Sequence, residues 1–260
     1  MARLSKAEGP SQGRALYFHE FFLAANKMGR LRRMRVLAVI PAFNEEECLA
    51  NTVRSLEEAC PEVDYLVVND GSRDDTRAII AREELHGTNL PINTGLTSAF
   101  RTGMKYALRH GYDAVVQFDA DGQHLPAYIP VMAQALGEHD ASIVIASRYL
   151  DGTVRPSGAR GAGSRLITWL IRLTTGATIT DPTSGMRMYG REMIRMFATE
   201  FDCAPEPDMV ALVARRYGRV KEIQATMQER QGGESYLKLG NVIKYMSRTC
   251  LSILTLRFLR

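Results

Sequence analysis

The chain has 260 residues, of which 45% are hydrophobic and 24% are charged. This composition suits one α/β domain with a full apolar core, and it excludes a largely disordered chain. The formal net charge of +4 favours anionic partners such as phosphates or a membrane surface, but it is too small to indicate a nucleic-acid-binding protein.

Residues 1–33 differ in composition from the rest of the chain. They start with small and polar residues, contain Phe18, Phe21 and Phe22, and end in a basic stretch at residues 30–33. We interpret them as an N-terminal extension; the alternative is an amphipathic basic helix that contacts a membrane or a partner. They lack the apolar core of a secretory signal, and no segment of the chain has the roughly 18 consecutive apolar residues that cross a bilayer.

Strand-like and helix-like segments alternate from residue 34 onwards. Residues 36–40 form a continuous apolar run, which predicts a buried strand. Asn44, with Glu47 three residues later, has the spacing of a capping box and predicts the start of a helix. The apolar residues of that helix recur at helical spacing and predict one buried face: Leu49, Val53, Leu56 and Cys60.

The alternation continues along the following hundred or so residues of the chain. Further strands are predicted at residues 65–68, 114–118 and 142–146, and helices at residues 74–84, 99–107 and 129–136. Small residues recur at every fourth position of the helix at residues 99–107, which would let it approach the sheet closely.

Such alternation predicts an α/β domain over residues 34–235, with a Rossmann-like, mostly parallel sheet flanked by helices. Ligands of such sheets bind at the carboxyl ends of the strands, so the polar loops that follow the strands are expected to converge.

One of these loops, residues 118–124, carries two aspartates one residue apart. Asp119 and Asp121 follow a predicted strand and precede Gly122. Two such carboxylates can hold Mg²⁺ or Mn²⁺ and leave open positions for the phosphate oxygens of a nucleotide diphosphate. The alternative is an ordinary turn with solvated aspartates.

Five motifs in order make the chain resemble family 2 glycosyltransferases, whose fold is called GT-A. They are residues 40–46 (IPAFNEE), 68–76 (VNDGSRDDT), 93–95 (NTG), 118–124 (FDADGQH) and 181–187 (DPTSGMR). A closer likeness, to the branch of dolichol-phosphate mannose synthases and polyprenyl-phosphate sugar transferases, rests on residues 147–149, 158–161 and 228–235.

The resemblance implies a site for a nucleotide-sugar donor. The loop from Pro41 to Glu45 is similar to the part that holds the ribose, and Asp70 is similar to the carboxylate that binds the nucleobase; an Asx turn is the alternative for Asp70. The full donor set that the resemblance implies is Pro41, Asn44, Glu45, Asp70, Gly71, Asn93, Gly95, Asp119, Arg148 and Arg187.

The resemblance also implies a divalent cation, Mg²⁺ or Mn²⁺. Asp121 is expected to bind the metal directly, Asp119 to face the metal or the donor ribose, and Gln123 to be a third ligand. For Gln123 and His124, a role in the turn itself is the alternative. Charge on the leaving phosphate would be met by arginines, whose fork binds phosphate in a bidentate way. The candidates are Arg148, Arg160, Arg187 and Arg230, with surface solvation as the alternative.

The residues expected to act in catalysis are Asp121, Arg230 and Asp208, in an inverting transfer. Relatives that use a hydroxyl acceptor carry a Glu-Asp pair from which residues 206–208 (Glu-Pro-Asp) depart. A lipid phosphate is already ionised and needs no general base, so the departure favours a phosphate acceptor. The alternative for Asp208 is capping of a helix N-terminus.

Residues 236–260 predict an amphipathic basic helix. It can lie on an anionic membrane or pack on the domain. Tyr236 stands where the polyprenyl-phosphate branch usually has a lysine, and no pair of transmembrane segments follows, so a small membrane-protein partner is a further hypothesis.

We therefore expect a metal-dependent inverting glycosyltransferase of the cytoplasm, peripheral at the inner face of the membrane. It would move a sugar from a nucleotide diphosphate to a polyprenyl phosphate or a lipid-linked acceptor. The alternatives are transfer to a sugar hydroxyl in cell-surface polysaccharide synthesis and a non-catalytic nucleotide-sugar-binding scaffold. Four cysteines without C-x-x-C spacing agree with reduced thiols in the cytoplasm.

Overall fold

The computed structural model describes residues 34–152, 158–200, 204–228 and 239–255. Residues Arg35–Arg260 form one compact unit, which holds the described helices and strands. The expected N-terminal extension, residues 1–33, lies outside the described residues.

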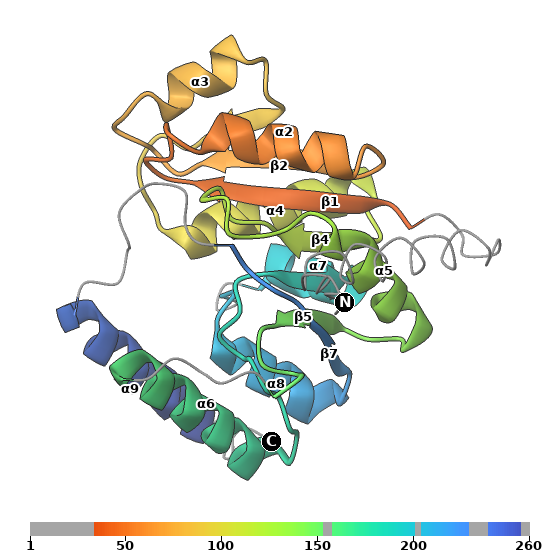
Figure 1. Ribbon diagram of the computed structural model, residues 1–260, viewed down its shortest axis with the longest axis vertical. Coiled ribbons are helices and arrows are strands. Elements are labelled where there is room, and N and C mark those ends of the chain that lie inside the picture. The colour runs from red at the N-terminus through yellow and green to blue at the C-terminus, as the bar shows by residue number, and fades with distance from the viewer. Residues whose placement is uncertain (1–33, 153–157, 201–203, 229–238, 256–260) are drawn as a thin grey trace, which may run out of the picture. The chain divides into compact units, whose positions relative to one another are not determined.

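The described residues contain a seven-stranded sheet at the centre of this unit (Figure 1). The strands are β1 (Val36–Ala42), β2 (Asp64–Asn69), β3 (Gly87–Asn89), β4 (Ala114–Gln117), β5 (Ile143–Ser147), β6 (Arg187–Gly190) and β7 (Val220–Gln224). Their order is β3-β2-β1-β4-β6-β5-β7, and β6 alone among them runs antiparallel to its neighbours. The predicted mostly parallel sheet is confirmed.

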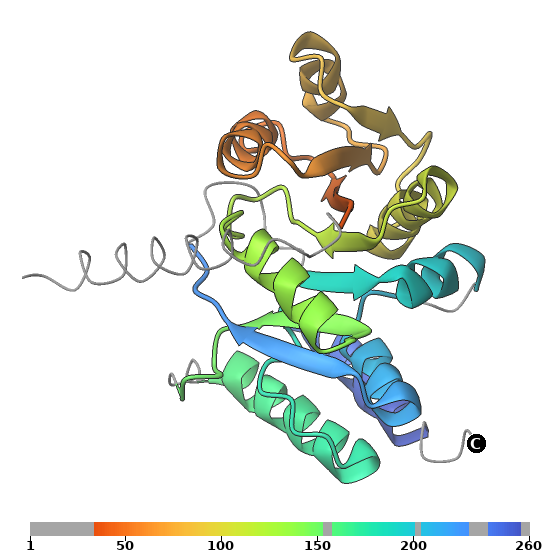
Figure 2. The same cartoon turned by 90° about the vertical axis from the view of Figure 1, so that its right-hand side faces the viewer.

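Helices lie on both faces of the sheet. They are α2 (Leu49–Ala59), α3 (Thr76–Arg82), α4 (Leu96–His110), α5 (Tyr128–Glu138), α6 (Ala159–Thr175), α7 (Arg191–Thr199), α8 (Pro207–Tyr217) and α9 (Leu239–Thr255). Figure 2 shows α4 and α7 on one face of the sheet, with α2 and α5 on the other. Helices α6, α8 and α9 pack against one another.

The core on the α4 and α7 face follows from the two-residue alternation of the strands. Leu37, Val115, Tyr189 and Ile143 form one row across four strands, and all of them are buried. Helix α4 approaches this face closely, because a Cβ at Gly103 would lie 2.4 Å from a Val39 methyl carbon. The predicted stripe of small residues is thus what lets α4 approach the sheet.

The predicted capping box at Asn44 is wrong. Helix α2 begins at Leu49, and its N-cap residue Cys48 makes no side-chain cap hydrogen bond. Asn44 has a positive φ of 56°, and its side-chain oxygen accepts a hydrogen bond from the backbone N–H of Arg73. An asparagine side chain serves a turn as readily as a helix start, and here the loop after β2 provides the donor.

Candidate active site

The polar loops converge on one edge of the sheet, as expected for the carboxyl ends of parallel strands. The loops after β1, β2, β4, β5 and β7 begin at this edge. Because β6 is antiparallel, its first residue, Arg187, lies at the same edge, and the segment before it reaches the site from the other direction. The sequence motif at residues 181–187 therefore lies at the same edge of the sheet as the four motifs that follow parallel strands.

The loop after β4 presents two aspartates in different surroundings. The Asp119 side chain is 35% exposed, whereas Asp121 is 5% exposed. Asp121 Oδ1 accepts a hydrogen bond from the backbone N–H of Gln123 at 3.0 Å, which is an Asx turn. The loop thus needs Asp121 for its own shape as well as for any ligand.

His124 fixes the backbone beneath Asp119. Its Nδ1 atom accepts a hydrogen bond from the Asp119 backbone N–H at 2.9 Å, so the neutral ring carries its proton on Nε2. That Nε2 atom lies 3.6 Å from Asp119 Oδ2. The ring is buried, with its edge against Phe118. The turn role that sequence reasoning left open for His124 is thus present in the structure.

The Asp119 carboxylate lies in a space that only glycine leaves open. A Cβ built on Gly185, in the segment before β6, would lie 2.7 Å from Asp119 Oδ2 and 3.3 Å from His124 Nε2. On the other side, Gln117 Nε2 donates to Asp119 Oδ1 at 3.3 Å. Gln117, through its side chain, and Gly185, through the Cβ that it lacks, position the Asp119 carboxylate. Neither was predicted, because a glutamine in a strand and a glycine in a loop carry no chemical signature in the sequence.

Asp70 holds the segment between β3 and α4. Its carboxylate accepts hydrogen bonds from the backbone N–H groups of Thr94 and Gly95 and from the Thr94 hydroxyl, at 2.7–3.0 Å. Gly71, with a φ of +66°, lies so close that a Cβ there would be 2.6 Å from the backbone nitrogen of Asn93. The structure therefore brings Asp70, Gly71, Asn93 and Gly95 together, as the resemblance implied.

The loop after β1 is joined to the loop after β2. The backbone N–H groups of Asn44 and Glu45 donate to the hydroxyls of Ser72 and Thr76, respectively, at 3.0 and 2.9 Å. Pro41 lies in β1 itself, opposite Val68 in register. Two of the expected donor-binding motifs thus form one hydrogen-bonded surface.

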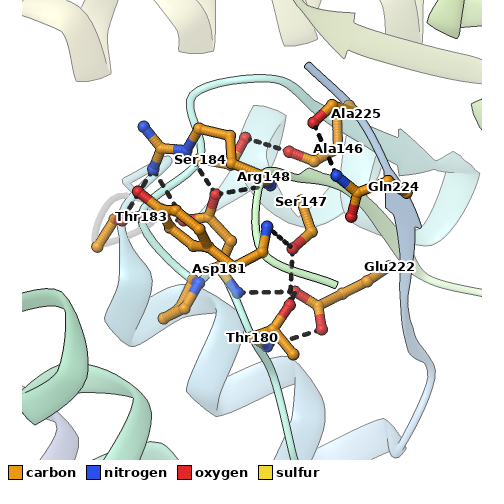
Figure 3. Close-up of polar contacts among 12 residues, drawn as sticks. Ala146, Ser147, Arg148, Thr180, Asp181, Thr183, Ser184, Glu222, Gln224 and Ala225 are labelled. Carbon is orange, nitrogen blue, oxygen red and sulfur yellow. Dashed lines mark hydrogen bonds and ion pairs between the residues drawn. The ribbon is translucent and has the colours of Figure 1, made fainter. Parts of the chain in front are cut away.

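Arg148 contacts a carboxylate instead of standing free for phosphate. Its Nε and Nη2 atoms donate to Asp181 Oδ2 and Oδ1 at 2.6 and 2.8 Å, and Nη2 also reaches the Thr183 hydroxyl at 3.3 Å (Figure 3). Burial alone would raise the pKa of Asp181, but the hydrogen bonds and charge of Arg148 lower it. The guanidinium thus ties the end of β5 to the segment before β6.

Glu222 of β7 completes this network, although it was not predicted. Its carboxylate accepts hydrogen bonds from the backbone N–H groups of Thr180 and Asp181 and from the Thr180 hydroxyl, at 2.7–3.0 Å (Figure 3). The Thr180 hydroxyl also contacts the Ser147 hydroxyl at 2.6 Å. A single acidic residue in a strand gives no sequence signal for such a role.

Arg187 is a buried cation beside the aspartate loop. It is opposite Gln117 in register and 3% exposed, and its Nη2 atom donates to the Pro182 carbonyl at 2.7 Å. Its Nε and Nη1 atoms, like the Tyr189 hydroxyl, are buried without a hydrogen-bond partner among the described residues. Burial raises the pKa of Tyr189, and the Arg187 charge opposes that shift. Arg187 therefore lies within the sheet, beneath the loops.

The acidic residues at the start of α8 divide into two roles. Glu206 is the N-cap residue, and burial together with the Asp208 charge raises its pKa. Asp208 is in the first turn, and its Oδ2 atom accepts a hydrogen bond from the Ser252 hydroxyl of α9 at 2.7 Å. Glu206 makes no side-chain cap hydrogen bond, whereas Asp208 Oδ1 accepts the Met209 backbone N–H at 3.0 Å in the first turn. Asp208 thus binds a backbone N–H at the start of α8 and also joins α8 to α9. Arg230 and the side chain of Arg160 lie outside the described residues.

The aspartate loop suits a hard divalent cation. Among the described residues, no three His, Cys, Asp or Glu side chains converge as a metal site. Mg²⁺, however, is usually held by one or two carboxylates, with substrate phosphates and water completing its shell. Asp119, half-exposed in the space left by Gly185, and the neighbouring Asp121 fit that pattern. Gln123 packs nearby, with its Nε2 atom 3.5 Å from the Gln228 carbonyl.

Comparison with protein families identifies the family to which this fold belongs. The family model described as "Glycosyl transferase family 2" matches residues 37–197, which contain all five motifs. The chain belongs to glycosyl transferase family 2. The predicted family, the GT-A fold and the assignment as a glycosyltransferase are thereby confirmed.

Several members of glycosyl transferase family 2 resemble the chain over most of its length. It is 34% identical to an undecaprenyl-phosphate mannosyltransferase of Micrococcus luteus, over 80% of this chain and 90% of the relative. It is 32% identical to a polyprenol monophosphomannose synthase of Mycolicibacterium smegmatis, over 82% and 84% of the two chains. An undecaprenyl-phosphate 4-deoxy-4-formamido-L-arabinose transferase of Sodalis glossinidius is 31% identical, over 86% and 70%.

Among solved structures, the fold is similar to that of glucosyl-3-phosphoglycerate synthase from Mycobacterium tuberculosis. The TM-score is 0.66 at 20% identity, over 90% of this chain and 81% of the other, for a complex with Mn²⁺, UDP-glucose and phosphoglyceric acid. A second complex of that enzyme, with Mn²⁺, UDP and glucosyl-3-phosphoglycerate, gives the same TM-score at 18% identity. The family model matches residues 37–197, whereas the structural similarity covers 90% of the chain. The GT-A assignment therefore applies to the fold as a whole.

None of the described helices of this family 2 chain is both long enough and apolar enough to span a membrane.

Proposed function

We propose that this protein transfers a sugar from a nucleotide-diphosphate sugar to the phosphate of a polyprenyl phosphate, with inversion at the anomeric carbon. The observation that supports it most is the aspartate loop held against Gly185, in a chain whose relatives at 31–34% identity are named for sugar transfer to polyprenyl phosphates. The acceptor phosphate would attack while the nucleoside diphosphate leaves.

The donor would bind across the loops after β1, β2 and β4. The surface that joins Asn44 and Glu45 to the loop after β2 suits the nucleoside, with Asp70 holding the Asn93–Gly95 segment against it. The diphosphate would then extend toward Asp119 and Asp121. Arg230, in residues that the structure does not describe, stays a proposed ligand of the leaving phosphate.

Asp119 and Asp121 would hold a divalent cation, Mg²⁺ or Mn²⁺, with Gln123 beside them. The cation would neutralise charge that develops on the leaving diphosphate. The role of the protein is to fix both carboxylates: Gln117 and His124 orient Asp119, and the Asx turn orients Asp121. Because Arg148 is committed to Asp181, we assign it to positioning of the acceptor side of the site.

A phosphate acceptor also agrees with the carboxylates of α8. Asp208, the candidate general base, accepts hydrogen bonds from the Ser252 hydroxyl of α9 and from the Met209 backbone N–H, which give it a structural role between the two helices. An ionised phosphate attacks without proton removal, so it needs no general base. The protein would accordingly work at the cytoplasmic face of a membrane, where its lipid substrate lies.

The test is synthesis of a lipid-linked sugar by the purified protein. It is incubated with UDP-, GDP- and dTDP-sugars and undecaprenyl phosphate, with Mg²⁺, with Mn²⁺ or with EDTA. We expect a lipid-linked product with one donor class, lost in EDTA. Asp121→Asn, which keeps the oxygen that the Asx turn needs, should lower turnover about a hundredfold or more without unfolding the protein.

Asp140→Asn is the matched control, because it makes the same change from aspartate to asparagine outside the aspartate loop. Asp140 is exposed, and its ion-pair partner is Arg219. It should turn over like the parent. Transfer to a glycan hydroxyl with no lipid-linked product would instead support the polysaccharide alternative. Tight nucleotide-sugar binding without turnover under any metal condition would support the scaffold alternative.

A further inference from the structure

Helix α6 exposes an apolar stripe to solvent. Leu166, Trp169 and Leu173 follow one another at spacings of three and four residues, so they lie on one side of the helix. They are 44%, 57% and 55% exposed, whereas Ile167 and Ile171 on the opposite side are fully buried. The helix therefore has two apolar sides, of which the domain covers one, and a contiguous exposed patch of this kind marks an interaction surface.

The charged residues of α6 itself are all arginines. Arg165 and Arg172 are exposed on α6 beside the stripe, and residues 159–175 contain no Asp or Glu. A tryptophan and leucines flanked by arginines are typical of helices that lie in the headgroup region of an anionic bilayer. The arginine stems can lie along the apolar side while their guanidinium groups reach lipid phosphates.

Helix α9, like α6, has exposed apolar side chains and no acidic residue. It packs on α6, where a Cβ at Gly163 would lie 3.1 Å from the Met246 side chain (Figure 1). Leu251 and Leu254 are 64% and 42% exposed, and residues 239–255 likewise contain no Asp or Glu. Two helices that pack on each other thus both carry exposed apolar side chains and no acidic residue.

The chain also links this surface to the active site. Residues 148–158 connect the carboxyl end of β5, where Arg148 and Asp181 meet, to the start of α6. Leu150, in that connection, is 44% exposed. A membrane contact through α6 would hold the acceptor side of the site close to lipid headgroups.

We propose that α6, through Leu166, Trp169 and Leu173, is the surface on which this protein rests on an anionic lipid bilayer. The proposal rests on the proposed function, because a polyprenyl phosphate is presented at a bilayer surface. A second copy of the chain fits the stripe less well, since a stable interface buries about 800 Å² per partner and one convex helix offers much less.

Trp169 makes the proposal directly measurable, because it is the only tryptophan of the chain. The full-length protein is titrated with vesicles of phosphatidylcholine and phosphatidylglycerol that contain no polyprenyl phosphate and no donor. We expect a blue shift of Trp169 fluorescence, quenching by brominated acyl chains and weaker binding at high salt. Binding to the vesicles without any change in Trp169 emission would place the contact elsewhere and overturn the proposal.

Variants show whether the protein binds vesicles through the apolar stripe of α6 or through other exposed apolar residues. The double substitution Leu166→Ser/Leu173→Ser keeps Trp169 and is expected to weaken vesicle binding about tenfold or more. Ile92→Ser is the matched control, since Ile92 is 65% exposed but lies between β3 and α4. Equal binding by the double variant and the parent would overturn the proposal, as would a lipid-free, concentration-dependent Trp169 shift, which would favour a second copy.

A water-soluble, short-chain polyprenyl phosphate distinguishes this proposal from the proposed function. The double variant should turn it over at the parental rate and lose activity only on the long-chain lipid in vesicles. If the parent failed on both acceptors, the proposed function would fail, whereas the vesicle titration would still decide the membrane contact.

Discussion

Arg148 and Asp181 form a two-point ion pair in which one partner is far more deeply buried than the other. Asp181 is 0% exposed and Arg148 is 34% exposed. The pair joins the end of β5 to the segment that carries Gly185 toward Asp119. The position of the Asp119 carboxylate therefore depends on an ion pair that belongs to the fold.

Unequal burial predicts unequal costs of breaking this pair. Arg148→Met leaves the Asp181 carboxylate buried without its partner and is expected to cost about 3–5 kcal/mol of unfolding free energy. Asp181→Asn leaves a guanidinium that can still reach water, and it should cost about 1–2 kcal/mol less than Arg148→Met. Urea unfolding at pH 7 measures both values. Equal costs for the two variants would contradict the asymmetry.

Gly185→Ala is expected to lower activity with little loss of stability. The new Cβ would overlap the space of Asp119 Oδ2, so the carboxylate would turn away and leave the backbone in place. A displacement of about 1 Å in a catalytic group can reduce turnover about tenfold to a hundredfold. Turnover and thermal midpoint are measured together on the same preparation.

Gly190→Ala is the control for that substitution. A Cβ there makes only ordinary contacts, the nearest at 3.5 Å from the Ala141 carbonyl oxygen. It should keep nearly parental turnover. A Gly185→Ala enzyme as active as the Gly190→Ala enzyme would show that Asp119 does not need its observed position.

Two substitutions of His124 test which ring nitrogen holds the loop. Asparagine can place an acceptor oxygen near the position of Nδ1, whereas glutamine places its terminal atoms near Nε2. Because Nδ1 accepts the Asp119 backbone N–H, His124→Asn should be more stable than His124→Gln by about 1 kcal/mol, although glutamine is closer to histidine in size. Denaturant unfolding decides the order, and the reverse order would refute the hydrogen-bond assignment.

The raised pKa of Glu206 predicts a pH-dependent stability difference. Burial and the Asp208 charge favour the protonated carboxyl in the folded state. The stability that the protonated Glu206 carboxyl contributes to the folded state is therefore fully present below the ordinary pKa of glutamate. This stability is lost as the pH rises through the raised pKa of Glu206. Glu206→Gln stays neutral, so its stability relative to the parent should increase as the pH rises through the raised pKa of Glu206, by less than about 1 kcal/mol because solvent screens the partly exposed carboxyl.

Thermal unfolding at several pH values follows this difference. Glu58→Gln, at an exposed position of α2, serves as the control and should run parallel to the parent. A constant difference between Glu206→Gln and the parent over the whole range would show that the Glu206 charge has no special cost.

The sequence predicted those parts of the site that depend on local pattern and strand direction. Asp70, Asp119 and Asp121 follow apolar runs, and parallel strands bring their loops to one edge. The environment of Arg148 could not be predicted, since an arginine that binds phosphate and one that binds a carboxylate look alike in sequence. Strand β6 was also missed, because its four residues include the buried Arg187 and carry no two-residue alternation.

Helical periodicity likewise could not predict which apolar residues of α6 are buried and which are exposed. The pattern identifies apolar positions but not what covers them, so the buried Ile167 and the exposed Trp169 give the same signal. Only the packing of α8 and α9 against α6 shows which side the domain uses.

The reversed direction of β6 has an evolutionary consequence. Residues 34–124 lead to Asp119 through parallel strands, and the segment before β6 reaches the same carboxylate from the opposite direction, through Gly185. In the function proposed above, the loops that bind the nucleoside and the segment that faces the acceptor would thus come from consecutive parts of the chain. Exchanges in the later part would then change the molecule that receives the sugar and leave nucleoside binding as it was.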